Sequence, residues 1–477
     1  MKGRIVGASA AIGHLLREHK DAKPAQTAEK EIVIIGGGVS GLSAARYLQK
    51  NGFKSLTLLE LEDHTGGNAA HGENELSRFP WGAHYIPVPN NDLTEYLHFL
   101  EEAGVITGWN ENKLPVYNDL YLCFDPQERL YINGKWQDGL VPHYGVPTNE
   151  LRQIEAFLKK MDEYRHLKDA NGKDAFAIPV DLSSREEIFV LLDRITMKEW
   201  LLAEGFDSEY LHQYVNYCCR DDFGTPLHLV SAWAGIHYFA SRKGRGANAG
   251  HSDVLTWPEG NGFLVEHLQK DLYKHVKTNS LALKVQERDG MVEVDWFDVK
   301  ARRMERIIAK YCIIAAPQFV AAKLLQDQQR AAQVKQTMDY APWMVANLKV
   351  TTLEERSGAP ASWDNVLHNS YSLGYVEATH ELLQQRVNAK NITYYLPLTE
   401  SSPTDERKKA QSKTHEDWTN IIMQDLQKVH PGIRHATEEL NVMIWGHAMV
   451  QPRPGMIHGP ARIDLSKSIG SIHFAHS

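Results

Sequence analysis

The sequence has few cysteines, no run of basic residues and no long hydrophobic run. Four cysteines in 477 residues are too few for a disulfide framework, and none has metal-site spacing, so we expect buried free thiols. No stretch of 18 apolar residues occurs, which argues against a transmembrane helix. The 23 histidines show neither H-x-H nor H-E-x-x-H spacing. We therefore predict no metal site.

Charge and composition narrow the class further. The chain has 52 basic and 60 acidic side chains, a net charge of −8, and so lacks the Lys/Arg excess that binding to nucleic acid requires. Its 43% apolar and 23% charged residues are typical of a globular protein of two or three domains. The first 17 residues contain no export signal. We predict a cytoplasmic protein, or a periplasmic one if an upstream leader is missing, and the sequence does not indicate an oligomeric state.

A dinucleotide-binding pattern begins at the first clear strand. The β-branched run 31–35 is followed by Gly36-x-Gly38-x-x-Gly41, a helical pattern over 42–51 and a second strand that ends in Glu60. In such a β–α–β unit the glycines allow a tight turn, close approach of a diphosphate and close packing of helix on strand. Uncapped N–H groups at the start of the helix favour the anion, and the terminal acid accepts hydrogen bonds from ribose.

Several motifs after Glu60 resemble the FAD-binding amine oxidase and phytoene desaturase superfamily. The segment 61–68 contains the turn Gly66-Gly67-Asn68, the run 257–264 resembles the family's Pro-x-Gly-Gly segment, and 315–317 resembles its strand end. The resemblance covers about residues 31–325 and implies bound FAD. It implies these cofactor-binding residues: Gly36, Gly38, Ser40, Gly41, Glu60, Gly66, Gly67, Asn68, Gly82, Ala83 and Val285.

The sequence departs from the family pattern in three places. Asn68 stands where the family usually has arginine, and Glu62 stands where a basic residue is common, so the diphosphate would depend more on backbone N–H groups. The final residues, 471–477, resemble the strand that precedes the family's last flavin-binding segment. From the sequence we expect a chain truncated at that segment.

The resemblance also predicts the architecture. The expected class is α/β: a Rossmann-like (GR2-type) FAD-binding domain and a second α+β substrate domain with a mixed sheet and helices. The assigned ranges are an arm and linker at 1–30, with 18–30 as the linker, an FAD-binding domain at 31–92, 256–325 and 441–477, and a substrate-binding domain at 93–255 and 326–440.

Two segments supply candidate catalytic residues. His84 and Tyr85 follow Gly82 and Ala83 at the place where the family passes beside the flavin ring, so they either face the substrate or fill a core turn. Trp445 lies where amine oxidases have an aromatic wall, and His447 is a candidate proton acceptor because its ordinary pKa is near neutral.

Candidate substrate-binding residues gather in 216–224. This segment contains Tyr217, Arg220, Asp221 and Asp222. Buried charges must be paired, so we predict that Arg220 pairs with Asp221 or Asp222. The alternatives are a structural ion pair and recognition of a cationic substrate.

Three functions are consistent with these motifs. The first is an FAD-dependent oxidoreductase that removes a hydride from carbon and oxidises an amine or polyamine to an imine, with oxygen or an unknown acceptor. The second is desaturation or isomerisation of an apolar polyene on the same fold. The third is a non-catalytic flavoprotein-like subunit.

Overall fold

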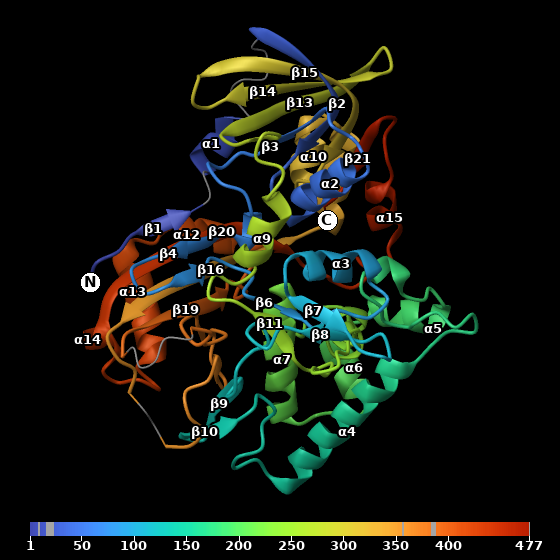
Figure 1. The fold of residues 1–477 in the computed structure, drawn as a ribbon. Helices are drawn as coiled ribbons and strands as arrows, with labels where there is room; N and C mark the ends of the chain where they lie inside the picture. Colours follow the sequence, from blue (N-terminus) through green and yellow to red (C-terminus); the bar gives the residue numbers. More distant parts are fainter. Residues whose placement is uncertain (8–9, 16–22, 355–356, 383–387, 477) are drawn as a thin grey trace. The chain divides into compact units, whose positions relative to one another are not determined.

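The structure is a computed structural model that describes residues 1–7, 10–15, 23–354, 357–382 and 388–476. The chain forms two compact units (Figure 1). Unit 1 comprises Met1–Val6, His71–Asn261 and Tyr340–His458, and unit 2 comprises Gly7–Ala70, Gly262–Asp339 and Gly459–Ser477.

Unit 2 contains the predicted β–α–β segment. Strand β2 (Gln26–Ile35), helix α2 (Val39–Lys50) and strand β3 (Leu56–Leu59) follow one another, and β2 pairs parallel with β3. The side chains of Ile32 to Ile35 are at most 5% exposed, as expected for a strand covered on both faces. The sheet runs β12-β3-β2-β15-β14-β13, and β21 pairs with the end of β15.

The remaining elements of unit 2 complete this sheet and its helices. Its further strands are β12 (Val276–Lys277), β13 (Ser280–Arg288), β14 (Met291–Asp298), β15 (Arg303–Ile314) and β21 (Ile472–Phe474). Its further helices are α1 (Ala10–His14), α9 (Gly262–Gln269), α10 (Gln318–Leu324), α11 (Gln328–Thr337), α15 (Pro460–Ser466) and the 3-10 turn η2 (Gly67–Ala69). The predicted hairpin between β13 and β14 is confirmed, and Asp289 and Gly290 have the positive φ that its turn requires.

Unit 1 is organised around a mixed sheet in the order β1-β20-β16-β19-β18-β17-β9-β10. Its strands are β1 (Ile5–Gly7, whose last residue falls in unit 2), β9 (Glu128–Ile132), β10 (Lys135–Asp138), β16 (Tyr340–Val350), β17 (Asp364–Leu367), β18 (Tyr375–Glu377), β19 (Lys390–Pro397) and β20 (Thr437–Val450). Three small pairs accompany it: β4 (His71–Glu73) with β5 (Arg78–Pro80), β6 (Tyr85–Pro87) with β11 (Val254–Thr256), and β7 (Ile106–Trp109) with β8 (Pro115–Tyr117). One face of the large sheet packs against α13 through a core that includes Trp418 and Ile422.

Helices form the rest of unit 1. They are α3 (Thr94–Glu102), α4 (Thr148–His166), α5 (Glu187–Val190), α6 (Met197–Ala203), α7 (Glu209–Phe223), α8 (Ala232–Ala240), α12 (Pro403–Ser412), α13 (His415–Leu426) and α14 (Ile433–Ala436), with 3-10 turns η3 (Val180–Leu182) and η4 (Leu191–Arg194). Helix α8 packs against α4, α6 and α7. Helix α7 begins after Ser208, whose side chain accepts from the N–H of Leu211, and ends at Gly224 in the left-handed region.

Two assignments made from sequence differ from the structure. Residues 26–30, assigned to a linker, form the first half of β2, because their backbone pairs in parallel register with Glu305–Ala309 of β15 while their polar side chains stay largely exposed. Residues 18–22 of that predicted linker lie outside the described residues. Residues 71–92, 256–261 and 441–458, assigned to the FAD-binding domain, lie in unit 1, and residues 326–339, assigned to the substrate-binding domain, lie in unit 2. For 441–450 the reason is that β20 pairs along β16 as one strand.

The structure shows the state of the cysteines and the character of the helices. All four cysteines are free and buried, as predicted. Within the described ranges, no helix combines the length and the apolar composition that crossing a bilayer needs.

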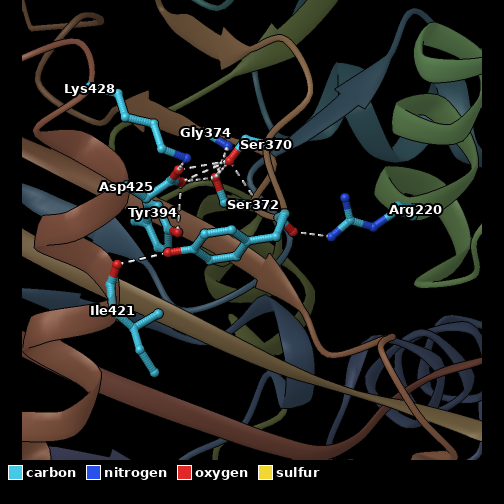
Figure 2. A network of polar contacts seen from close by, with 9 residues as sticks. Arg220, Ser370, Ser372, Gly374, Tyr394, Ile421, Asp425 and Lys428 are labelled. Atoms are coloured by element: carbon cyan, nitrogen blue, oxygen red, sulfur yellow. Dashed lines mark hydrogen bonds and ion pairs between the residues drawn. The ribbon is translucent and has the colours of Figure 1, made fainter. Parts of the chain in front are cut away.

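A buried carboxylate joins α13 to the sheet of unit 1. Asp425 is fully buried and accepts hydrogen bonds from Ser370 (2.8 Å), Ser372 (2.5 Å) and Tyr394 (3.0 Å), and it pairs with Lys428 (2.8 Å) (Figure 2). A buried charge with several donors is stabilising in place, but removing it leaves the donors without a partner.

We predict that Asp425→Ala lowers the free energy of unfolding by about 3 kcal/mol, because three buried or half-buried hydroxyl groups lose their acceptor. Chemical denaturation monitored by circular dichroism measures this change. Asp405→Ala, at an exposed carboxylate on α12, is the matched control and should change stability far less. Equal losses in the two variants would contradict the role given to Asp425.

Candidate functional site

The glycine motif of unit 2 is held in a conformation that only glycine allows. Gly36 has φ of +109°, and a Cβ placed on it would lie 2.4 Å from the carbonyl oxygen of Ala315. A Cβ on Gly41 would lie 1.9 Å from the carbonyl oxygen of Gly36. These two glycines therefore let the turn between β2 and α2 pass against β15 and let the helix start close to the strand.

The second glycine turn and the terminal acid converge on the first turn. The carboxylate of Glu60 accepts from the backbone N–H of Gly37 (2.6 Å) and of Glu62 (2.8 Å). The N–H of Gly66 donates to the carbonyl of Gly37 at 2.9 Å. Burial raises the pKa of Glu60, and the two backbone donors oppose that rise. The structure thus brings together glycines 36, 38, 41, 66 and 67 and Glu60.

These residues fit a dinucleotide. Helix α2 starts at Gly38 without a side-chain cap, so its first N–H groups stay available to an anion. A Cβ on Gly38 would meet only the Cα of Gly67, at 4.0 Å, which leaves space above the helix start for a diphosphate. Each oxygen of Glu60 accepts one backbone bond and retains capacity for a ribose hydroxyl.

The positions of the other predicted cofactor-binding residues do not by themselves indicate a bound dinucleotide. Ser40 is half-buried in the first turn of α2, and Asn68 is exposed in η2. Val285 is buried opposite Val294 in the hairpin. It is Ser280, at the start of β13, whose N–H reaches the carbonyl of Glu60, at 2.8 Å.

A second group of polar side chains lies within unit 1. Asp364 and Glu128 are neighbours across the parallel pair β17–β9. Tyr217 of α7 donates to Asp364 at 3.2 Å, and Tyr85 donates to Asp221 at 3.5 Å. We call this group, with the rings around it, the acidic–aromatic cluster; its members are His84, Tyr85, Glu128, Tyr217, Asp221, Asp222, Arg242, Trp363, Asp364 and Tyr395.

The cluster carries more carboxyl groups than cations. Within the part of the chain that the structure describes, the one ion pair made by its four carboxyls is Asp222–Arg242, at 3.1 Å. Arg242 also donates to the hydroxyl of Tyr85 at 3.3 Å. Four acids around one guanidinium leave a site that favours either protons or an added cation.

The pKa values of the acids reflect this imbalance. Burial, and then the neighbouring Asp222, raise the pKa of Asp221 to about 7, although Arg242 opposes the shift. Burial, Glu128 and Asp221 raise the pKa of Asp364 well above its ordinary value. Burial also raises the pKa of Tyr85 and lowers that of His84 to about 4, so both are neutral at pH 7.

Aromatic rings surround the cluster. The ring of His84 lies 4.6 Å from Tyr395 and 5.5 Å from Trp363, measured between centroids. The Nε1–H of Trp445 donates to the carbonyl of Trp81 at 2.6 Å, and Trp445 packs on the same apolar group as Tyr85. Faces of such rings attract cations.

The turn before His84 is fixed by backbone contacts. The carbonyl of Gly82 accepts from the hydroxyl of Tyr395 at 2.9 Å, and that of Ala83 accepts from the N–H of Asn261 at 3.0 Å.

His447 lies apart from the cluster: it is exposed on β20, with its ring 6.3 Å from that of Tyr340. Lys349, in β16, pairs with Glu75 and Glu438.

The predicted pairing of Arg220 with Asp221 or Asp222 is wrong. Arg220 donates to the backbone carbonyl of Tyr371, whereas Asp222 pairs with Arg242. Successive residues of a helix point about 100° apart, so Arg220 and its two acidic neighbours leave α7 in different directions. Adjacent charges in a helix do not face each other.

Sequence reasoning also missed five members of the cluster, namely the rings of Trp363 and Tyr395 and three charged residues. Arg242 follows α8, Glu128 begins β9 and Asp364 begins β17. No local spacing joins them, because only the pairing of β9 with β17 and the packing of α7 against α8 brings them together. Among the described residues, no group of three or more His, Cys, Asp or Glu side chains is arranged to hold a metal ion.

The raised pKa of Asp221 predicts a pH-dependent stability. The folded chain holds this proton up to about pH 7, whereas an unfolded aspartate loses it near pH 4. Stability therefore falls as the pH rises from about 4 to 7, and Asp221→Asn should remove this part of the fall. We expect the variant to match the wild type at pH 4 and to be more stable at pH 8, in urea titrations at both pH values.

Asp417→Asn is the control with the opposite sign. Hydrogen bonds from Thr414 lower the pKa of Asp417, so its contribution to stability is present at neutral pH and is lost in acid. This variant should be less stable than the wild type at pH 8. If Asp221→Asn also lost stability at pH 8, the proposed burial of its charge would be contradicted.

Comparison with known proteins agrees with this geometry. Residues 34–102 match the NAD(P)-binding Rossmann-like domain family. The flavin-containing amine oxidase of Oncorhynchus mykiss is 26% identical over 297 residues, which are 60% of this chain and 50% of that protein. The chain thus spans about half the length of this curated relative.

Solved structures share the fold over most of the chain. A double mutant of putrescine oxidase superposes with a TM-score of 0.71 at 16% identity and covers 94% of both chains. A fatty acid isomerase from P. acnes superposes with a TM-score of 0.66 at 16% identity, over 94% of this chain and 93% of that one. The superfamily predicted from the motifs is confirmed: this chain has the Rossmann segment and the fold of the FAD-dependent amine oxidase and phytoene desaturase-like flavoproteins.

Proposed function

We propose that the protein is an FAD-dependent oxidoreductase that oxidises an amine or polyamine to an imine. The observation that carries the proposal is the excess of carboxyl groups over cations in the acidic–aromatic cluster. Similarity to a flavin-containing amine oxidase and to putrescine oxidase supports it.

The glycine turns of unit 2 would hold the cofactor. The N–H groups at the start of α2 would bind the diphosphate, and Glu60 would accept from the ribose. FAD, when bound, supplies the acceptor for the hydride. Oxygen or another acceptor would then take the electrons from the flavin. The location of the protein, cytoplasmic or periplasmic, stays a prediction.

The cluster of unit 1 would bind the amine. An ammonium group would supply the positive charge that Asp221, Glu128 and Asp364 lack, and the faces of Tyr85 and Tyr395 would add cation–π attraction. Tyr85, which stays protonated, would orient Asp221 through its hydroxyl group. Asp221 would accept a proton from the ammonium, since loss of hydride from carbon requires the neutral amine.

Desaturation or isomerisation of an apolar substrate is the weaker alternative. The fatty acid isomerase shares the fold, but four carboxyl groups beside the aromatic rings would be poorly matched to a hydrocarbon chain. A non-catalytic subunit would need no such cluster.

We predict that the purified protein is yellow and that an amine or diamine, added without oxygen, bleaches the flavin absorption. A polyene or an unsaturated fatty acid should leave the spectrum unchanged. Anaerobic absorption spectroscopy compares the substrates in one experiment. Bleaching by the apolar substrate alone would support the alternative, and a colourless protein that takes up no FAD would exclude both oxidoreductase functions.

We further predict that Asp221→Asn raises the amine concentration needed for half-maximal bleaching by about 10- to 100-fold, because the loss of one charged partner of a buried ammonium costs roughly 1.4 to 3 kcal/mol. The variant should still take up FAD, since Asp221 is not one of the residues assigned to the cofactor. Asp417→Asn serves again as the matched control and should leave the required concentration unchanged. An unaltered concentration for Asp221→Asn would remove this residue from the amine site.

A further inference from the structure

Arg220 is a buried cation without an acidic partner. Its side chain is on α7 and the residue is 7% exposed. Its one hydrogen bond among the described residues goes to the carbonyl of Tyr371, and its Nε is buried without a partner. A guanidinium stays charged in proteins, and a buried charge is costly unless an opposite charge balances it.

The carboxylates around Arg220 form no ion pair with it among the described residues: Glu400 acts on the guanidinium only through space, and Asp425 has other partners. Asp425 is bound by Ser370, Ser372, Tyr394 and Lys428. Figure 2 shows Asp425 and Arg220 at opposite ends of this network. Asp221 and Asp222 leave α7 in other directions and belong to the acidic–aromatic cluster. Within the described part of the chain, Arg220 therefore has no carboxylate in direct contact.

A small cavity adjoins Arg220. It has a volume of about 70 Å³ and is lined on one side by the α7 face that carries Gln213, Tyr217 and Arg220, and on the other by the segment from Val366 to Ser372. This volume exceeds that needed for one water molecule and suits a chloride or a formate ion. Gluconate is several times bulkier than either ion and serves below as the comparison.

Two further side chains in the cavity wall have unused polar atoms. His368 Nε2 and Gln213 Oε1 are both buried without a hydrogen-bond partner. Burial lowers the pKa of His368, and its neutral ring can donate through Nε2–H. The side-chain nitrogen of Gln213 donates to Glu209 at 3.0 Å. Oε1 of Gln213 is the atom left without a partner, and a water molecule in the cavity can donate to it.

We infer that this cavity binds one small monovalent anion, chloride or a short carboxylate, between the Arg220 guanidinium and the His368 ring. The anion neutralises the charge that the protein leaves unpaired and accepts hydrogen bonds from Arg220 Nε and His368 Nε2. A water molecule beside it donates to Gln213. The cavity shares Tyr217 with the acidic–aromatic cluster, but Arg220, His368 and Gln213 are not members of the cluster, and the inference does not depend on the proposed oxidase function.

Thermal unfolding of the FAD-loaded protein tests this site. At equal ionic strength, chloride or formate should raise the midpoint of unfolding by about 1–3 °C relative to gluconate, because a ligand that binds only the folded state stabilises it. The separate chloride and formate arms identify which anion fits better. Equal midpoints in all three salts would overturn the inference.

Substitution assigns the effect to Arg220. Arg220→Met should lose the chloride or formate increment whatever its own midpoint, whereas Arg185→Gln, at an exposed arginine of the same unit, should keep it. If Arg220→Met does not fold, crystals of the wild type soaked in bromide replace it. An anomalous peak within about 3.5 Å of the guanidinium supports the site, and water alone at that position overturns it.

Discussion

The acidic–aromatic cluster of unit 1 holds four carboxyl groups and, among the residues that the structure describes, a single guanidinium, and this charge imbalance favours binding of a cation or a proton. Removing a carboxylate from water is costly unless a cation or a proton compensates it. Arg242 compensates Asp222 directly, while burial raises the pKa of Asp221, Glu128 and Asp364. The imbalance persists because the fold, rather than local pairing, holds these acids together.

The sheet of unit 1 supplies the rigidity that this arrangement needs. Glu128 and Asp364 are held as neighbours by the ladder between β9 and β17, so they cannot separate without loss of backbone hydrogen bonds. Behind the sheet, the contacts of Asp425 and the apolar core around Trp418 fix α13. An acid pair on a firmly packed sheet can keep a strained charge state that a loop would relax.

The sequence allowed a reliable prediction wherever the signal was local. The turn from β2 to α2 and the hairpin at Asp289-Gly290 need glycine at defined positions, so a single sequence is enough to locate them. Polar residues 26–30 were misassigned because their strand is held by backbone pairing with β15, which leaves no apolar pattern. Arg242, Glu128 and Asp364 were missed for a related reason, since strand pairing and helix packing join positions far apart in the chain.

The case of Arg220 shows how the same helix can serve two opposite electrostatic environments. Successive residues point about 100° apart around its axis, so Arg220 points toward the segment 366–372 while Asp221 meets Tyr85. The prediction that Arg220 pairs with Asp221 or Asp222 ignored this geometry, because these side chains point away from one another. Tyr217 links the two environments, because its ring lines the cavity of Arg220 while its hydroxyl donates to Asp364. One helix therefore presents an unpaired cation to one side and an excess of acids to the other, with Tyr217 contributing to both.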